Sequence, residues 1–374
     1  MIISKKKTKK DIVFLLSFIA IFMIISRSGL IKYLVLSAGI VVAFLFRKKQ
    51  RLEYYQLLLH AAVYSSIGVV MALVSGNFSF NSIKQLLIYF CSGLFAITFF
   101  SLYGTNNSCK LVDIQFVALC IAYICLFGRN LSIHQLYFES NIYAYIFAVY
   151  GLLYFWQNRY KAACVAAVFM LIDHKRIATY SFILCCLVMF FVKRIKKDKK
   201  RKWISRIAAG LLLVVPFVWV YLCSNGMLIS LFSRFHINTM GRLEGTGAWN
   251  IVREYYVFSP GYLGKGIGWV LEWLENANIA SFSNLHNDFL AAYIELGCLG
   301  FLLWVVSFQL IPKKIGKEDR SIQNLVYIIM GFMFMNLLTD NIYLYVTFML
   351  PLYTVLLSLL YGEDRKSYSK DRLI

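Results

Sequence analysis

The sequence predicts an all-α, polytopic transmembrane helical bundle, and two features carry that prediction. Of the 374 residues, 60% are apolar and only 15% are charged, which leaves too little polar surface to coat a soluble globule of this size. Apolar runs long enough to cross roughly 30 Å of hydrocarbon recur from one end to the other, separated by short polar or basic turns. We therefore expect residues 1–374 to form a single integral membrane domain.

These apolar runs give about twelve spans. The first run follows a Lys-rich stretch, but no small-residue cleavage site comes after it, so we interpret it as a spanning helix and not as a signal peptide. The segment 160–173 is short, and losing it would invert every later element. The expected spans are 12–26, 29–46, 54–74, 85–103, 111–128, 141–157, 160–173, 177–192, 203–223, 289–311, 321–339 and 341–361.

The basic residues orient this arrangement. With twelve spans, 28 of the 39 Lys and Arg residues fall on the side that holds both termini, 10 fall on the opposite side, and Arg206 lies inside a span. Because cytoplasmic connections are enriched in Lys and Arg, this bias places both termini in the cytoplasm and supports a helix at 160–173. The same placement accounts for the net charge of +21, so we do not expect a nucleic-acid partner.

One connection is much longer than the others. Residues 224–288 are expected to form a large extracytoplasmic loop, whereas most other connections have about ten residues or fewer. The loop contains Trp249, Trp269 and Trp273, and this aromatic content favours packing over disorder. It contains no cysteine, which excludes a disulfide or a thiolate metal site within it.

The most informative candidate for chemistry is His286, where this loop meets the tenth span. Asn287 or Asp288 is a natural N-cap for the following helix, and the positive end of the helix dipole disfavours a protonated imidazole. His286 is therefore a candidate general base; the alternative is an interfacial polar residue. Asn287, Asp288 and Glu295 are the candidate supporting residues of this site. Glu295 follows on the same helix face as Asp288, and the alternative for it is a structural hydrogen-bond node.

Outward-facing arginines are candidates for binding a phosphate. A guanidinium fork matches the oxygen geometry of a phosphate and stays charged, so two arginines could hold a diphosphate without a metal. Arg176 opens a span, and Arg242 and Arg253 lie in the long loop. The alternative for each is an ordinary solvated charge.

Two other patterns are rejected as sites. The Gly-rich stretch 261–268 lacks the βαβ context of a nucleotide-binding loop, and it is expected to face away from cytosolic nucleotides. We expect it to be a flexible turn that lets backbone approach a bulky ligand. Glu272 and Glu275 have no further ligands at suitable spacing, so no metal site is expected.

Taken in order, these features resemble the O-antigen polymerase and ligase family of bacterial envelope polysaccharide glycosyltransferases. The resemblance covers about residues 170–345, and Asp340-Asn341 also looks like the final region of that family. Lys175 departs from it, since the family usually has a small hydroxyl residue before the first arginine. The matching residues are Arg176, Gly241, Arg242, Trp249, Gly264, Gly266, Gly268, His286, Asn287, Glu295, Leu296, Gly297 and Gly300.

The resemblance implies a metal-independent transferase in the bacterial inner membrane, with a glycosyltransferase-C type helical body and an extracytoplasmic active site. Its donor would be an undecaprenyl-diphosphate-linked oligosaccharide, and no cofactor is implied. Arg176 and Arg242, with Lys175 sharing the role of Arg176, would bind the diphosphate, and His286 would deprotonate the acceptor hydroxyl. A flippase and a chain-length regulator are candidate protein partners.

The leading hypothesis is a polymerase of polysaccharide repeat units. A ligase that transfers the glycan to a different acceptor shares the same donor chemistry, so the sequence does not separate the two. A flippase of lipid-linked oligosaccharides is the alternative from another class. It predicts charged residues in the middle of several spans and a repeat between the two halves, and neither pattern is visible.

Overall fold

The computed structural model describes most of the chain, and every regular element in the described part is helical. Strands are absent from those residues, which confirms the all-α prediction. The described residues are 5–25, 31, 34–35, 37–38, 41, 52–103, 108–132, 142–234, 247–277, 285–317 and 319–361.

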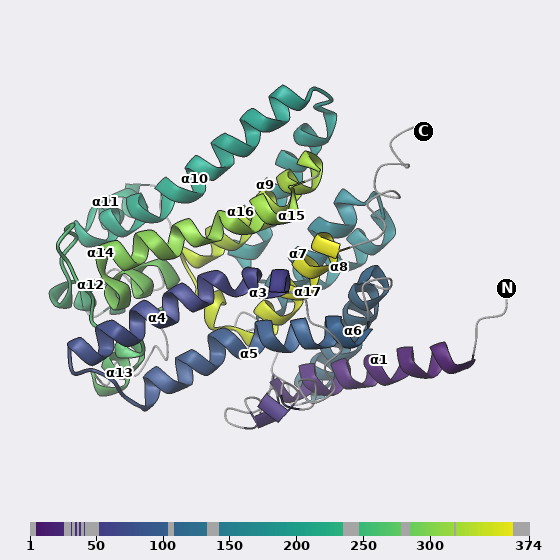
Figure 1. Ribbon diagram of the computed structural model, residues 1–374, viewed down its shortest axis with the longest axis horizontal. Helices are drawn as coiled ribbons and strands as arrows, with labels where there is room; N and C mark the ends of the chain where they lie inside the picture. Colours follow the sequence, from purple (N-terminus) through teal and green to yellow (C-terminus); the bar gives the residue numbers. More distant parts are fainter. Residues whose placement is uncertain are drawn as a thin grey trace.

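Within the described residues, most neighbouring helices are joined by short connections (Figure 1). Long helices α4, α5, α10 and α14 run side by side along the molecule, and the short helices α12 and α13 lie at one end of them. The elements are α1 (Lys5–Ile25), α3 (Leu52–Tyr55), η1 (Gln56–Leu58), α4 (Leu59–Val74), α5 (Phe80–Tyr103), α6 (Ser108–Ser132), α7 (Tyr143–Trp156), α8 (Tyr160–Ile172), α9 (Arg176–Arg194), α10 (Asp198–Ser224), α11 (Met227–Arg234), α12 (Ala248–Ile251), η3 (Val252–Tyr255), α13 (Trp269–Asn276), α14 (Asp288–Phe308), α15 (Leu310–Ile315), α16 (Arg320–Leu337), η4 (Ile342–Leu344) and α17 (Val346–Tyr361).

Eleven of the predicted spans coincide with helices, including the doubtful segment 160–173, which is α8. The predicted span 29–46 lies largely outside the described residues. Six described helical segments are long and apolar enough to cross a membrane, and three shorter apolar helices accompany them. The number of twelve crossings therefore stays a prediction. The six segments are Gln56–Val74, Phe80–Tyr103, Ser108–Arg129, Arg176–Arg194, Asp198–Ser224 and Asp288–Ile315.

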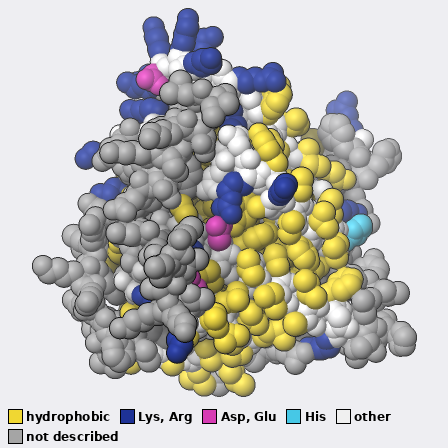
Figure 2. Space-filling view, turned by 90° about the vertical axis from the view of Figure 1, so that its right-hand side faces the viewer, with side chains coloured by type: hydrophobic (Ala, Val, Ile, Leu, Met, Phe, Trp, Pro, Cys, Tyr) yellow, Lys and Arg dark blue, Asp and Glu magenta, His cyan; other side chains and the backbone are white. Residues whose placement is uncertain are grey.

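The surface carries the pattern of a bilayer protein. Tyr180, Leu187 and Phe191 of α9 and Leu211 of α10 are each more than half exposed, although all four are large apolar side chains. Such a surface needs an apolar surrounding. Figure 2 shows hydrophobic side chains over much of one face and Lys and Arg gathered at its top, over the α9–α10 junction at 193–202. This basic cluster matches the predicted cytoplasmic connection.

Helix α14 is broken at Gly297, and the Gly-rich stretch fills the break. Gly297 has a φ of 74° and a ψ of 179°, so the helical hydrogen bonds stop there. The freed carbonyl of Ile294 accepts from the Lys265 N–H at 2.9 Å, and that of Glu295 accepts from Gly266 N–H at 2.9 Å. On the other side of the break, the Cys298 N–H donates to the Tyr262 carbonyl at 2.8 Å. The loop thus supplies the partners that a bilayer could not.

The glycines of this stretch allow a close approach between backbones. A Cβ at Gly264 would lie 2.5 Å from the Gly297 nitrogen, and one at Gly266 would lie 2.2 Å from the Ala72 Cα. The close approach of this stretch is made to the α4 and α14 backbones of the chain itself, and the expected approach to a bulky ligand stays a prediction.

We expect Gly297→Ala to destabilise the protein by at least about 2 kcal/mol. A positive φ with a ψ near 180° is almost confined to glycine and costs another residue about 1–3 kcal/mol, and the new Cβ would also meet the Leu263 carbonyl carbon at 2.4 Å. Thermal unfolding in detergent, followed by tryptophan fluorescence, measures the change. Gly210→Ala is the matched control, because Gly210 lies inside α10 with nothing within 4 Å of its Cβ position. A stability equal to that of the control would contradict the role given to the break.

Candidate functional site

A buried carboxylate, Asp340, organises the polar cluster that contains His286. Asp340 lies between α16 and η4 and is 1% exposed. Its Oδ1 lies 3.1 Å from His286 Nδ1 and accepts from the Tyr345 hydroxyl at 2.8 Å. Its Oδ2 lies 2.9 Å from Lys175 Nζ and accepts from the Tyr145 hydroxyl at 2.5 Å. A carboxylate without such partners would be very costly to bury.

These contacts keep Asp340 ionised. Burial alone would raise the pKa of the Asp340 carboxyl, but the hydrogen bond from His286 and the charge of Lys175 hold that pKa well below its usual range. An ionised carboxylate only accepts hydrogen bonds, so the atom of His286 that faces it, Nδ1, carries a proton. In the neutral ring the other nitrogen, Nε2, is then the basic one.

The segment around His286 is held in an uncommon conformation. His286 has a φ of 53°, in the left-handed region where few residues other than glycine are found. The Trp249 indole N–H donates to the Leu285 carbonyl at 2.5 Å, and Asn287 caps α14 by accepting from the Leu290 N–H at 3.0 Å. Strained residues of this kind cluster at functional sites, because the surroundings must fix them. The cap confirms Asn287 over Asp288 of the two predicted N-caps.

The cluster joins segments that are far apart in the sequence. Tyr145 comes from the start of α7, Lys175 from the start of α9, His286 from the start of α14, and Asp340 and Tyr345 from the α16–α17 connection. All of these helix ends must therefore lie at one end of the bundle. The predicted alternation of helices across the membrane places these ends on one side as well, provided that α8 is one of the crossings.

The residues predicted to bind a diphosphate differ in their surroundings. Lys175 is in the cluster, and Arg176 is the next residue, exposed at the first position of α9. Arg242 lies outside the described residues, as do parts of the predicted loop 224–288. Arg253 is engaged with the chain itself: its Nε donates to the Ser224 carbonyl at 3.0 Å, and its guanidinium packs on Gly226. Diphosphate binding by these residues stays a prediction.

The predicted supporting acids have structural contacts. The Glu295 carboxylate is fully buried in α14 and accepts four hydrogen bonds, as expected for the structural alternative. The Asp288 carboxylate accepts from the Tyr343 N–H at 2.9 Å, which ties the start of α14 to η4. The four donors to Glu295 are the Tyr64 hydroxyl, Gln85 Nε2 and the N–H groups of Gly268 and Val270.

Asp340, Tyr145 and Tyr345 were not among the predicted site residues. A signal for Asp340 exists in the sequence, since Asp340-Asn341 is a polar pair between two apolar runs, where an acid is rare. The tyrosines carry no comparable signal, because the chain has 25 of them. Among the residues that the structure describes, no three His, Cys, Asp or Glu side chains come close enough together to hold a metal ion.

No protein-family model matches the chain, and no curated protein matches it significantly.

Proposed function

We propose that the protein is a membrane-embedded glycosyltransferase that polymerises oligosaccharide repeat units carried on undecaprenyl diphosphate. In this proposal the chain crosses the bacterial inner membrane twelve times, with both termini in the cytoplasm and the site at the extracytoplasmic end. The observation that carries it is the contact of 3.1 Å between His286 Nδ1 and the buried Asp340 carboxylate, with Lys175 on the other carboxylate oxygen. Such a pair is a general base with its orienting acid.

In the proposed reaction, His286 acts as the general base and Asp340 as its orienting acid. Asp340 holds the proton on Nδ1, and Nε2 of His286 removes the proton from an acceptor hydroxyl. The hydroxyl oxygen then attacks the anomeric carbon of the donor. As the new C–O bond forms, the bond from that carbon to the diphosphate oxygen breaks, and the lipid diphosphate leaves with the electron pair. Fixed positive charge on Arg176 and Arg242 stabilises the charge that develops there.

Lys175 has a positioning role in this scheme. Its ammonium is 2.9 Å from Asp340 Oδ2 and 5.9 Å from the centre of the Tyr145 ring, so much of its charge is balanced within the cluster. It keeps Asp340 ionised and fixed, and Asp340 in turn orients the imidazole. The exposed guanidinium of Arg176, one residue further on, is better placed to meet an incoming diphosphate.

The decisive experiment is to incubate the purified protein with one lipid-diphosphate oligosaccharide and to separate the products by size. A ladder of longer glycans is the expected result. Product that forms only after a second, different acceptor is added would identify a ligase. Movement of the substrate across a proteoliposome bilayer without any new glycosidic bond would identify a transporter.

Replacing Arg176 and Arg242 together with alanine should lower kcat/KM for the lipid-diphosphate donor by about 10²-fold or more. Each charge-assisted hydrogen bond contributes about 1.5–3 kcal/mol, and two such contacts to one leaving group would be lost. Initial rates at several donor concentrations measure the change. Arg206→Ala is the control, because Arg206 is an exposed arginine of α10 near the basic α9–α10 junction. Equal rates in the double variant and the control would remove the diphosphate clamp from the proposal.

A further inference from the structure

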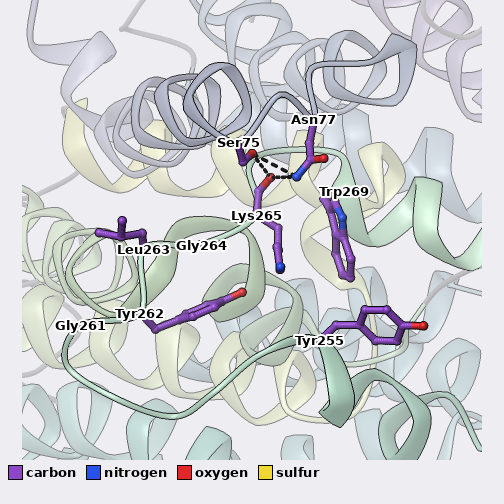
Figure 3. Close-up of a pocket in the computed structure, with 9 residues that line it drawn as sticks. All are labelled: Ser75, Asn77, Tyr255, Gly261, Tyr262, Leu263, Gly264, Lys265 and Trp269. Carbon is purple, nitrogen blue, oxygen red and sulfur yellow. Dashed lines mark hydrogen bonds between the residues drawn. The ribbon is translucent and has the colours of Figure 1, made fainter.

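A pocket of about 680 Å³ lies beside the Gly-rich stretch, away from the residues that contact Asp340. Its walls come from the α4–α5 turn, from η3, from the stretch 261–265 and from the start of α13 (Figure 3). The volume falls within the range of about 300–1,000 Å³ that is common for small-molecule sites. The lining residues are Ser75, Asn77, Tyr255, Gly261, Tyr262, Leu263, Gly264, Lys265 and Trp269.

Three aromatic rings line this pocket. The rings of Tyr255 and Trp269 lie 5.8 Å apart at 51°, and Trp269 stacks on Trp273 behind it. On the opposite wall, Tyr262 stacks on Tyr293 of α14 with ring centres 5.4 Å apart. Rings supported from behind offer a rigid flat surface, and such a surface packs well against the C–H face of a sugar ring while hydroxyl groups find polar partners at its edge.

Lys265 is the one charged residue among the nine that line the pocket. Its backbone is fixed, since its carbonyl accepts from Ser75 Oγ at 2.8 Å and Asn77 Nδ2 at 2.9 Å, and its N–H donates to the Ile294 carbonyl. Its side chain extends into the space between Tyr262 and Trp269 (Figure 3), with Nζ 5.9 Å from the centre of the Trp269 ring. An ammonium group on a fixed backbone, with no carboxylate among the nine lining residues, favours an anionic ligand.

We propose that this pocket binds a saccharide unit that carries a carboxylate, stacked on Trp269 and Tyr255 and paired with Lys265. The inference rests on the proposed function in one respect: the sugar would belong to the glycan that serves as acceptor. The Gly-rich stretch that carries Lys265 is bonded to α14 at its break, and His286 immediately precedes α14. The pocket and the general base therefore share one rigid support, as two parts of an extended glycan site require.

The test measures binding without a donor. The full-length protein in nanodiscs is titrated with a tetrasaccharide of galacturonic acid and, separately, with its methyl ester, which has the same rings but no charge. Wild type is expected to bind the acid more tightly than the ester. Lys265→Gln should weaken binding of the acid about fivefold and leave the ester unchanged, because one partly exposed charge pair is lost and the backbone contacts remain. Trp269→Leu should weaken both by about tenfold.

Leu263→Ala is the control, since Leu263 lines the same pocket, is 70% exposed and offers neither charge nor ring. Equal binding of acid and ester, or an acid affinity that Lys265→Gln leaves unchanged, would overturn the proposal. So would a Trp269→Leu variant that alters only thermal stability in nanodiscs, because the aromatic side chains would then be membrane-interface anchors. If the protein binds the galacturonic acid tetrasaccharide but forms no glycan ladder from the lipid-linked donor, only the proposed function is refuted. If it forms a ladder but does not bind the tetrasaccharide, only the proposal for the pocket is refuted.

Discussion

Replacing His286 with alanine should lower the rate of glycan transfer by about 10²- to 10⁴-fold and leave the protein folded in the membrane. A positioned general base contributes about this factor, and among the side chains described around Asp340 the imidazole of His286 is the one assigned that role, because Lys175 is paired with the other carboxylate oxygen. Single-turnover rates with the lipid-diphosphate oligosaccharide measure the loss. Elution from size exclusion and the unfolding temperature show whether the fold is kept.

The structure offers a close control for this variant. His174 is exposed and has a φ of 56°, so His174→Ala introduces the same side-chain change at a similarly strained backbone position. It should retain the wild-type rate. Asp340→Asn should also lose about 10²-fold or more, because the carboxylate charge that holds the proton on Nδ1 is lost and the contact with Lys175 is weakened. Full activity of the His286 variant would refute the general-base role.

Replacing Glu295 with leucine should destabilise the protein by about 4 kcal/mol or more. The carboxylate is fully buried and accepts four hydrogen bonds, which join α4, α5 and the start of α13 to α14. Each donor that loses its acceptor in the interior costs about 1–3 kcal/mol, and leucine offers no acceptor. We expect a strongly lowered unfolding temperature in detergent and a reduced yield of monodisperse protein.

Glu272→Leu is the matched control, because Glu272 is a partly exposed acid of α13, and it should change stability by less than about 1 kcal/mol. The stability of the Glu295→Gln variant should fall between those of the Glu295→Leu and Glu272→Leu variants. Glutamine keeps one acceptor oxygen, but its amide NH₂ group would face hydrogen-bond donors. The prediction distinguishes a structural role from a catalytic one. A Glu295→Leu variant with wild-type stability and no transferase activity would assign Glu295 to the chemistry instead.

Helix positions could be read from the sequence because each depends on local properties. An apolar run of sufficient length between basic turns forms a helix wherever the neighbouring helices lie, and the segment predicted at 160–173 is the helix α8, Tyr160–Ile172. The cap at Asn287 is local as well, since it needs only a side-chain oxygen three residues before an unpaired N–H group. The shared end of the bundle for Lys175 and His286 followed from counting helices.

Only the tertiary structure decided what these residues contact. Glu295 and His286 are both polar residues near one end of the same apolar run, yet the first accepts four structural hydrogen bonds and the second meets a carboxylate 54 residues away. The Gly-rich stretch likewise approaches a broken helix of its own chain. Hydrogen-bond partners and buried charge pairs depend on which helix ends meet in space, and hydropathy along the chain carries no information about that. The sequence by itself determined the positions of the helices and the candidate general base, His286. The packing of the helix ends decided that the carboxylate beside this imidazole is that of Asp340.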